Sequence, residues 1–244
     1  MVRDGIGNTE CLLDSVLMIG QSNMAGRGEL NEVKPIRNPM CYMLRMGRWQ
    51  PMSEPVNPDR SLFDGRYRSG VSLAASFADD YVRQLGRPLG LIPCADGGTT
   101  LSQWMPGEPN YDHAVALTKL ALRSSRLTAI LWHQGESDCV AEETVRTYRT
   151  RFLEMITRLR RDLNAEHVPL ILGELPQTIG ESWKTQGREA QLNQILRELA
   201  RELPNCAIAS SLGLTLKPDG VHFDSPACRE FGHRYFAKYL ELKV

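Results

Sequence analysis

The chain has 244 residues, which is enough for one domain with a full hydrophobic core, and nothing in its length requires a second domain. Its 29 Lys and Arg residues balance 29 Asp and Glu residues, so its formal net charge is zero. This balance removes the electrostatic argument for a nucleic acid, an anionic membrane or a polyanionic partner. A small substrate that is neutral or contacted locally fits the composition better.

The first ten residues carry charges and glycines where a signal peptide would need an apolar stretch, and no later run reaches membrane-spanning length. The sequence as given therefore predicts a cytoplasmic protein without a membrane partner, although a secreted or periplasmic protein whose signal peptide has been removed would look the same. The six cysteines are scattered singly, without a C-x-x-C pair. We expect buried free thiols rather than disulfides at Cys11, Cys41, Cys94, Cys139, Cys206 and Cys228.

Five short apolar segments are predicted to be strands, because each is too short and too evenly apolar for an amphipathic helix. They are Ser15–Ile19, Leu89–Pro93, Thr128–His133, Pro169–Gly173 and Cys206–Ser210. Helical patterns lie between and after them, at Val71–Leu85, Asp112–Ser124, Glu142–Leu163, Thr185–Glu202 and Pro226–Leu240. This alternation indicates βαβ units, and hence a single α/β domain with a parallel sheet covered on both faces.

The segment from 27 to 70 interrupts this alternation. It is rich in Pro, Asn, Gly and Arg and has no sustained period. Irregular segments of this length are uncommon in compact domains unless they are functional or disordered. We interpret it as a substrate-side insertion that carries short strands around Cys41–Leu44 and Trp49–Pro51.

Chemically useful residues follow four of the five predicted strands. Ser22 follows the first strand, the pair Gly97–Gly98 follows the second, and Gln134 follows the third. After the fifth strand, a short loop leads to Asp219 and His222. Because the carboxyl ends of parallel strands meet along one edge of a sheet, where ligands usually bind, we expect these residues to converge.

These residue types suit acyl transfer by a serine. A serine hydroxyl needs an adjacent base, and that base needs an acceptor that fixes its tautomer. Asp219 and His222 are three positions apart, so one turn can place the carboxylate at Nδ1 and leave Nε2 facing Ser22. The Ser22 N–H, Gly98 and the Gln134 amide are candidate donors to the oxyanion of the transition state.

Four segments together resemble the conserved blocks of the SGNH hydrolases, and more narrowly the branch of sialate O-acetylesterases and carbohydrate esterase family 6, which includes acetylxylan esterases. They are Gly20–Gly26 (GQSNMAG), Gly97–Thr99 (GGT), Trp132–Asp138 (WHQGESD) and Asp219–Phe223 (DGVHF). Their order and spacing extend over almost the whole chain.

The resemblance implies a flavodoxin-like three-layer α/β/α sandwich with a five-stranded parallel sheet. It also implies removal of O-acetyl groups from sugars without a cofactor. By this resemblance Ser22 is the nucleophile, His222 is the base, and Ser22, Gly98 and Gln134 form the oxyanion site. Gln134 stands where many SGNH enzymes outside this branch carry Asn.

The acid behind His222 has two candidates. Asp219 is the partner in most SGNH enzymes, whereas this branch places Glu136 close enough to be considered a triad member. We favour Asp219, because a local Asp-x-x-His pair requires no long-range placement, and we give Glu136 a supporting or substitute role.

Three further residues are candidates for binding substrate or the oxyanion. Gln21 precedes Ser22, Arg27 lies close to Ser22 in the sequence, and Trp104 could stack on a sugar ring or merely anchor its loop. His133, at the end of an apolar strand, fits a structural histidine better than a catalytic one. The acidic residues around His133 and His222 show no recognised metal-ligand spacing, so we expect no metal.

We therefore expect a carbohydrate O-acetylesterase with an acetylated sugar as its substrate. One alternative is an SGNH esterase or thioesterase acting on longer acyl chains, and another is a non-catalytic sugar-binding module that retains the fold. A flavodoxin-like phosphate binder is disfavoured, because neither glycine segment matches a phosphate-binding motif. The sequence leaves open the sugar and the oligomeric state.

Overall fold

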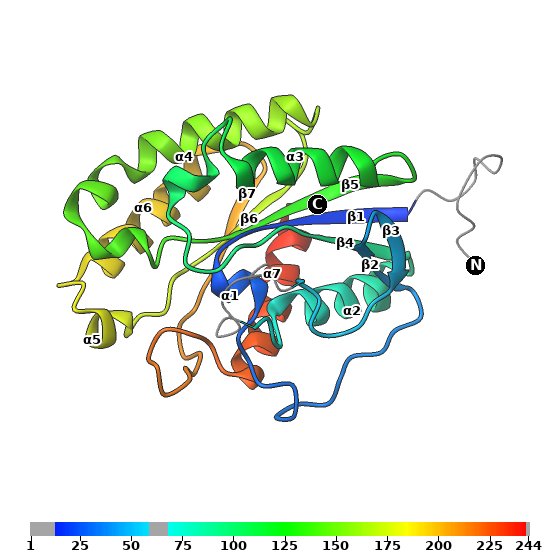
Figure 1. Ribbon diagram of the computed structural model, residues 1–244, viewed down its shortest axis with the longest axis horizontal. Helices are drawn as coiled ribbons and strands as arrows, with labels where there is room; N and C mark the ends of the chain where they lie inside the picture. Colours follow the sequence, from blue (N-terminus) through cyan, green and yellow to red (C-terminus); the bar gives the residue numbers. More distant parts are fainter. Residues whose placement is uncertain (1–12, 59–67, 243–244) are drawn as a thin grey trace.

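The structure is a computed structural model that describes residues 13–58 and 68–242. A twisted sheet of strand order β3-β2-β4-β1-β5-β6-β7 forms the middle layer, and helices cover both of its faces (Figure 1). The strands are β1 (Leu13–Gly20), β2 (Cys41–Arg45), β3 (Arg48–Pro51), β4 (Leu89–Pro93), β5 (Ser125–His133), β6 (Leu170–Gly173) and β7 (Cys206–Ala209). The predicted α/β/α architecture is confirmed.

The five predicted strands are β1, β4, β5, β6 and β7, and each pairs in parallel with its neighbours in this order. All residues of β1 are buried, as are those of β4 and β6. Strands buried on both faces read as continuous apolar runs, which is why the sequence located them. β2, β3 and β4 lie on one side of β1 in the sheet, and β5, β6 and β7 lie on the other. The topological switch point, where ligands usually bind in such sheets, therefore lies beside β1.

The sheet has seven strands rather than the five expected, because the irregular segment adds both of its predicted short strands. β2 pairs in parallel with β4, and β3 forms the antiparallel edge. Met46 and Gly47 join β2 to β3 with φ angles of 52° and 73°, the pattern of a two-residue type I′ hairpin. Residues 59–67 of the predicted insertion lie outside the described residues.

The helices are α1 (Ser22–Ala25), α2 (Leu73–Leu85), α3 (Pro109–Ala121), α4 (Glu142–Asp162), α5 (Ile179–Trp183), α6 (Arg188–Glu202) and α7 (Ser225–Glu241). The five longer helices match the five that were predicted, with ends that differ by a few residues. α2 and α7 cover one face of the sheet, and α3, α4 and α6 cover the other (Figure 1).

Each face has its own hydrophobic cluster. Under α2 and α7, the rings of Phe77 and Phe236 meet edge to face with centroids 5.7 Å apart. On the other face, Trp132 contacts Trp104 and Phe152 in the same way. The two clusters share the sheet between them and hold the strand ends, and therefore the site described below, in fixed positions.

As expected, five of the six cysteines are buried and form no disulfide within the described residues, namely Cys41, Cys94, Cys139, Cys206 and Cys228. Cys11 lies outside the described residues. Within residues 13–58 and 68–242, no helix is long and apolar enough to cross a membrane.

Candidate active site

Ser22 lies at the sharp turn that follows β1. Gly20, with φ of 128°, lies so close to the backbone of His133 in β5 that an added Cβ would collide with it. The Gln21 N–H then donates to the His133 carbonyl at 2.8 Å. Helix α1 begins directly at Ser22, so the Ser22 N–H is in the first turn and has no partner within the helix.

Ser22, His222 and Asp219 are joined by a chain of hydrogen bonds. His222 Nε2 lies 2.9 Å from Ser22 Oγ, and His222 Nδ1 lies 2.8 Å from Asp219 Oδ2. The other carboxylate oxygen of Asp219 accepts the backbone N–H groups of Val221 and His222, both at 2.9 Å. Two segments 200 residues apart in the sequence are thus brought together at the carboxyl edge of the sheet.

The environment keeps Asp219 ionised. Partial burial raises the pKa of this carboxyl group, but the backbone and side-chain hydrogen bonds from His222 and the Val221 N–H outweigh burial and lower the pKa below its ordinary value. An ionised Asp219 fixes the proton of His222 on Nδ1, so that Nε2 can accept the proton of Ser22. The arrangement can therefore activate the Ser22 hydroxyl as a nucleophile.

Glu136 contacts Asn23 and His133 rather than His222, so its place in the structure fits the supporting role better than that of the acid. It is fully buried, and its Oε1 accepts from Asn23 Nδ2 at 2.7 Å and lies 3.1 Å from His133 Nε2. Complete burial alone would raise the pKa of Glu136, but the attraction of His133 and the hydrogen bonds of His133 and Asn23 lower it. Asp219 occupies Nδ1 of His222, so Glu136 is left to support Asn23.

Asn23 is a positioning residue that the sequence interpretation missed. Its Nδ2 also donates to the Val221 carbonyl at 3.1 Å, and its Oδ1 accepts the Phe223 N–H at 3.1 Å. The side chain therefore clamps both sides of His222 to the turn that carries Ser22. The only sequence signal was its place next to Ser22 in the quoted motif, because the partners are 198 and 200 residues away.

Of the expected oxyanion donors, the Gln134 side chain needs a correction. Gln134 is fully buried, and its Nε2 donates to the Thr99 carbonyl at 3.0 Å and to Asp138 Oδ2 at 2.7 Å. Both protons of this amide are thus engaged, so the side chain supports the turn after β4 instead of facing the oxyanion. The glycine pair lies beside Ser22, since a Cβ added at Gly97 would lie 3.7 Å from Ser22 Cβ, and Gly98, with φ of 76°, follows in the same turn.

Two other candidate binding residues are buried. Trp104 is 1% exposed, its Nε1 donates to Thr99 Oγ1 at 2.9 Å, and its ring packs against Trp132. It anchors its loop and has no free face for a sugar. Gln21 is also 1% exposed, and its amide lies 3.2 Å from Gln134 Nε2. Both side chains therefore stabilise, from the interior of the protein, the turns that follow β1 and β4.

Arg27 is the candidate binding residue that does reach the site. It is half-buried, its Nη1 donates to the Gly26 carbonyl at 2.8 Å, and its guanidinium group lies against Gly97. A side chain at Gly97 would collide with it, so this glycine allows the cation to approach Ser22.

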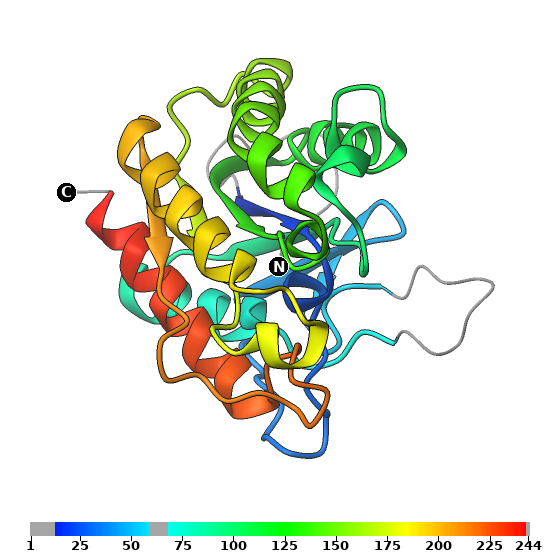
Figure 2. The same cartoon turned by 90° about the vertical axis from the view of Figure 1, so that its left-hand side faces the viewer.

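The helix beside the loop of Asp219 and His222 carries an exposed aromatic residue. Helix α5 packs against this loop (Figure 2), and a Cβ added at Gly220 would collide with Ser182 of α5. The next residue, Trp183, is 36% exposed. Trp183 could not be singled out from the sequence, because no local pattern encodes α5 or its contact with Gly220.

The fold, with this serine at the carboxyl edge of a mostly parallel sheet, is that of the SGNH hydrolases. Within this class, the family described as "Carbohydrate esterase, sialic acid-specific acetylesterase" matches residues 13–241. The chain belongs to this family of carbohydrate esterases.

The comparisons with single proteins agree. A probable carbohydrate esterase from Arabidopsis thaliana is 30% identical over 243 residues, covering 92% of this chain and 89% of the relative. The crystal structure of a protein from Arabidopsis thaliana superposes with a TM-score of 0.83 at 26% identity, covering 94% of this chain and 98% of the other. The structure of NanS superposes with a TM-score of 0.74 at 17% identity, covering 94% and 97% of the two chains, which is a likeness of fold.

Proposed function

We propose that this chain removes O-acetyl groups from carbohydrates through a Ser22–His222–Asp219 triad. The observation that carries the proposal is the unbroken series of hydrogen bonds from Ser22 Oγ through His222 to Asp219. The family supports an acetylated carbohydrate as the substrate.

In the first half of the reaction, Ser22 Oγ attacks the acetyl carbonyl carbon while its proton moves to His222 Nε2. The tetrahedral intermediate then expels the sugar oxygen, which takes this proton from His222. Ser22 is left acetylated. In the second half, a water molecule gives a proton to His222 and attacks the acetyl group, and acetate leaves as Ser22 regains its proton.

The negative charge of each tetrahedral intermediate needs donors on the side of Ser22 away from His222. The N–H of Ser22 at the start of α1 and the N–H groups of the Gly97–Gly98 turn are the donors we propose. Gln134 acts through this turn, by holding the Thr99 carbonyl.

The sugar lies on the outer side of this site in our proposal. Arg27 borders the Gly97 turn and offers a cation for a hydroxyl or an acidic group of the sugar. Because a guanidinium group binds a carboxylate in a bidentate manner, an acetylated acidic sugar such as a sialic acid would gain most from this contact.

The test is acetate release from acetylated sialic acids, acetylated xylan fragments, simple acetylated monosaccharides and an octanoate ester. We expect acetylated sugars to be hydrolysed and octanoate to be poor. Ser22→Ala should lower kcat by about 10⁴-fold or more. Ser125→Ala is the matched control, because Ser125 is equally buried but lies at the opposite end of β5, and it should retain activity. A Ser22→Ala variant that works at the parent rate contradicts the mechanism, and preference for octanoate contradicts the substrate class.

A further inference from the structure

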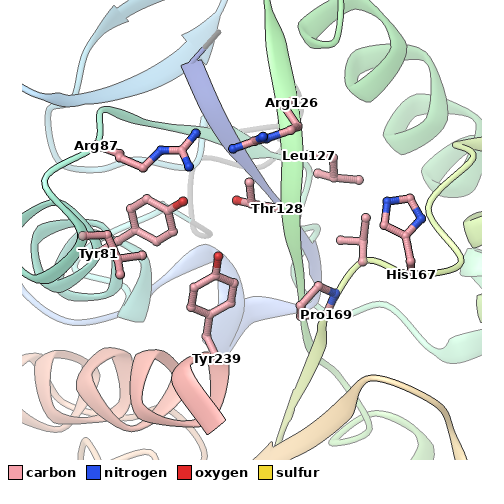
Figure 3. A pocket seen from close by; sticks show the side chains of 10 residues that line it. Tyr81, Arg87, Arg126, Leu127, Thr128, His167, Pro169 and Tyr239 are labelled. Atoms are coloured by element: carbon pink, nitrogen blue, oxygen red, sulfur yellow. The ribbon is translucent and has the colours of Figure 1, made fainter. Parts of the chain in front are cut away.

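A cavity, seen from close by in Figure 3, lies at the amino ends of the strands, at the opposite edge of the sheet from Ser22. Its volume is about 490 Å³. Asp14, beside it, is the second residue of β1, whereas Ser22 follows the end of β1, so roughly 25 Å of extended strand separates the two sites. The cavity is lined by Tyr81, Leu85, Arg87, Arg126, Leu127, Thr128, His167, Val168, Pro169 and Tyr239.

Two arginines share one buried carboxylate at this cavity. Asp14 is 1% exposed, and its Oδ1 accepts from Arg126 Nε at 3.2 Å and Nη2 at 2.9 Å. Arg87 Nε lies 2.9 Å from Asp14 Oδ2, which also accepts the Tyr81 hydroxyl at 2.6 Å. Two guanidinium charges against one carboxylate leave one positive charge uncompensated within this cluster.

Both arginines keep a part of their guanidinium group facing the cavity. Their side chains are 49% and 54% exposed for Arg87 and Arg126, and both bind Asp14 through Nε and Nη2, so each Nη1 points away from it. In Figure 3 the two side chains extend toward each other across one side of the cavity, and the hydroxyl groups of Tyr81 and Tyr239 point toward the same space.

The hydroxyl groups add no negative charge. Burial, together with the hydrogen bond to Asp14, raises the pKa of Tyr81, and burial raises the pKa of Tyr239. No Asp or Glu side chain is among the residues that line the cavity, and its other ionisable side chain is the imidazole of His167. The cavity is therefore polar and cationic on one side.

Part of the wall is apolar. Leu85, Leu127, Val168 and Pro169 contribute hydrocarbon surface to the lining beside the charged cluster. A free phosphate ion would leave this apolar surface exposed to water. An organic acid would bury it against its own apolar part and place its carboxylate at the arginines.

We propose that this cavity is a binding site for a small organic carboxylate, held by Arg87 and Arg126 through its carboxylate and by Leu85, Leu127 and Val168 through its apolar body. The planar guanidinium forks match a carboxylate in geometry as well as in charge. The site is independent of ester hydrolysis, because it lies at the other edge of the sheet and contains none of the residues around Ser22.

The test is calorimetric titration of the full chain with benzoate and, separately, with inorganic phosphate at constant ionic strength. We expect one equivalent of benzoate to bind and to raise the melting temperature, with phosphate at least tenfold weaker. Arg126→Gln leaves Asp14 paired with Arg87 and Tyr81 and should weaken benzoate binding about tenfold or more. Arg83→Gln is the matched control, since Arg83 pairs with Asp79 outside the cavity lining, and it should bind benzoate normally.

Leu85→Trp provides a second variant that keeps the Asp14 cluster intact. Leu85 is 38% exposed at the end of α2, so a larger ring can be accommodated there and should fill the mouth of the cavity. Benzoate binding should be lost while ester hydrolysis stays at the parent rate. Absence of saturable benzoate binding, equal affinity for phosphate, or normal benzoate binding by Leu85→Trp would each overturn the proposal.

Discussion

Two pairs of histidine and carboxylate lie close to Ser22, and their surroundings give them different roles. His222 and Asp219 lie at the surface, with side chains 21% and 44% exposed, and His222 faces the Ser22 hydroxyl. His133 and Glu136 are fully buried beneath the turn. A group that exchanges protons with substrate and water must be reachable, so the exposed pair suits catalysis and the buried pair suits support.

This difference predicts opposite outcomes for two isosteric variants. Asp219→Asn should lower kcat by about 10³- to 10⁴-fold, because an amide at this position favours the wrong tautomer of His222. Glu136→Gln should cost about tenfold or less, since Glu136 acts only through Asn23. Steady-state kinetics on an acetylated sugar checks both. A severe loss for Glu136→Gln with near-normal activity for Asp219→Asn would make Glu136 the acid.

Glu136 also predicts a dependence of stability on pH. Its pKa is lowered in the folded protein, so its ionised form stabilises the fold above the pKa of about 4.3 that a glutamate has in the unfolded chain. This contribution is lost as the pH falls through the lowered value. Urea unfolding between pH 6 and pH 3 should show a shallower loss of stability for Glu136→Gln than for the parent.

The control for this experiment is Glu143→Gln, which removes an exposed carboxylate that pairs only with the neighbouring Arg146. If Glu136→Gln and the parent lose stability along the same slope, the ionised Glu136 contributes nothing to acid sensitivity.

At the scale of elements, the site is made by turns that follow strands. The turn after β1 carries Ser22, the turn after β4 carries Gly97, and the loop after β7 carries Asp219 and His222. α7 begins directly after this loop, and its cap Asp224 accepts the Ala227 N–H at 2.8 Å, which fixes the position of the loop relative to the helix. Helix α5 borders the loop from the other side.

The position of α5 predicts a contribution of Trp183 to sugar binding. An exposed indole on this helix can stack on a sugar ring, and by analogy with pairs of aromatic rings we expect the contact to contribute about 0.5–1.5 kcal/mol. Trp183→Ala should therefore raise KM for an acetylated oligosaccharide by about 2- to 10-fold and leave hydrolysis of methyl acetate unchanged. Met46→Ala, at the exposed β2–β3 turn, is the control. An equal effect on both substrates would indicate a structural role for Trp183.

At the scale of the whole molecule, one sheet separates two hydrophobic clusters. The Ser22 site lies at the carboxyl ends of its strands, and the proposed carboxylate site lies at their amino ends. Every central strand contributes side chains to both clusters, as the alternation along β1 requires, with Val16 and Met18 on one face and Leu17 and Ile19 on the other. Unfolding of one cluster would therefore expose apolar side chains on one face of the strands whose other face forms the second cluster.

We accordingly predict that the chain unfolds as one cooperative unit. Phe77→Ala, in the cluster under α2, should lower stability by about 3–5 kcal/mol. Of the four tryptophans, Trp104 and Trp132 belong to the opposite cluster and Trp49 packs against it, so tryptophan fluorescence reports mainly on that cluster. It should change at the same lowered urea midpoint as far-UV circular dichroism. Separate midpoints for the two signals would divide the chain into two units.

The sequence by itself determined the alternation of strands and helices, and it pointed to Ser22, His222 and Asp219 as the residues to be brought together. Buried parallel strands are continuous apolar runs, and residues that follow them meet at one edge. Asp219 and His222 were predictable as a pair because they are three residues apart, so local geometry alone can join them.

Only the tertiary structure decided which of the candidate side chains are buried and which are exposed beside Ser22. Trp104 and Gln134 resemble binding residues in sequence, yet packing against Trp132 and hydrogen bonds to Thr99 and Asp138 bury them. The clamp made by Asn23 joins atoms about 200 residues apart, and the cluster at Asp14 joins β1 to residues beside β4 and in β5. Burial and long-range contacts depend on how separate elements pack, and no local pattern of residues encodes them.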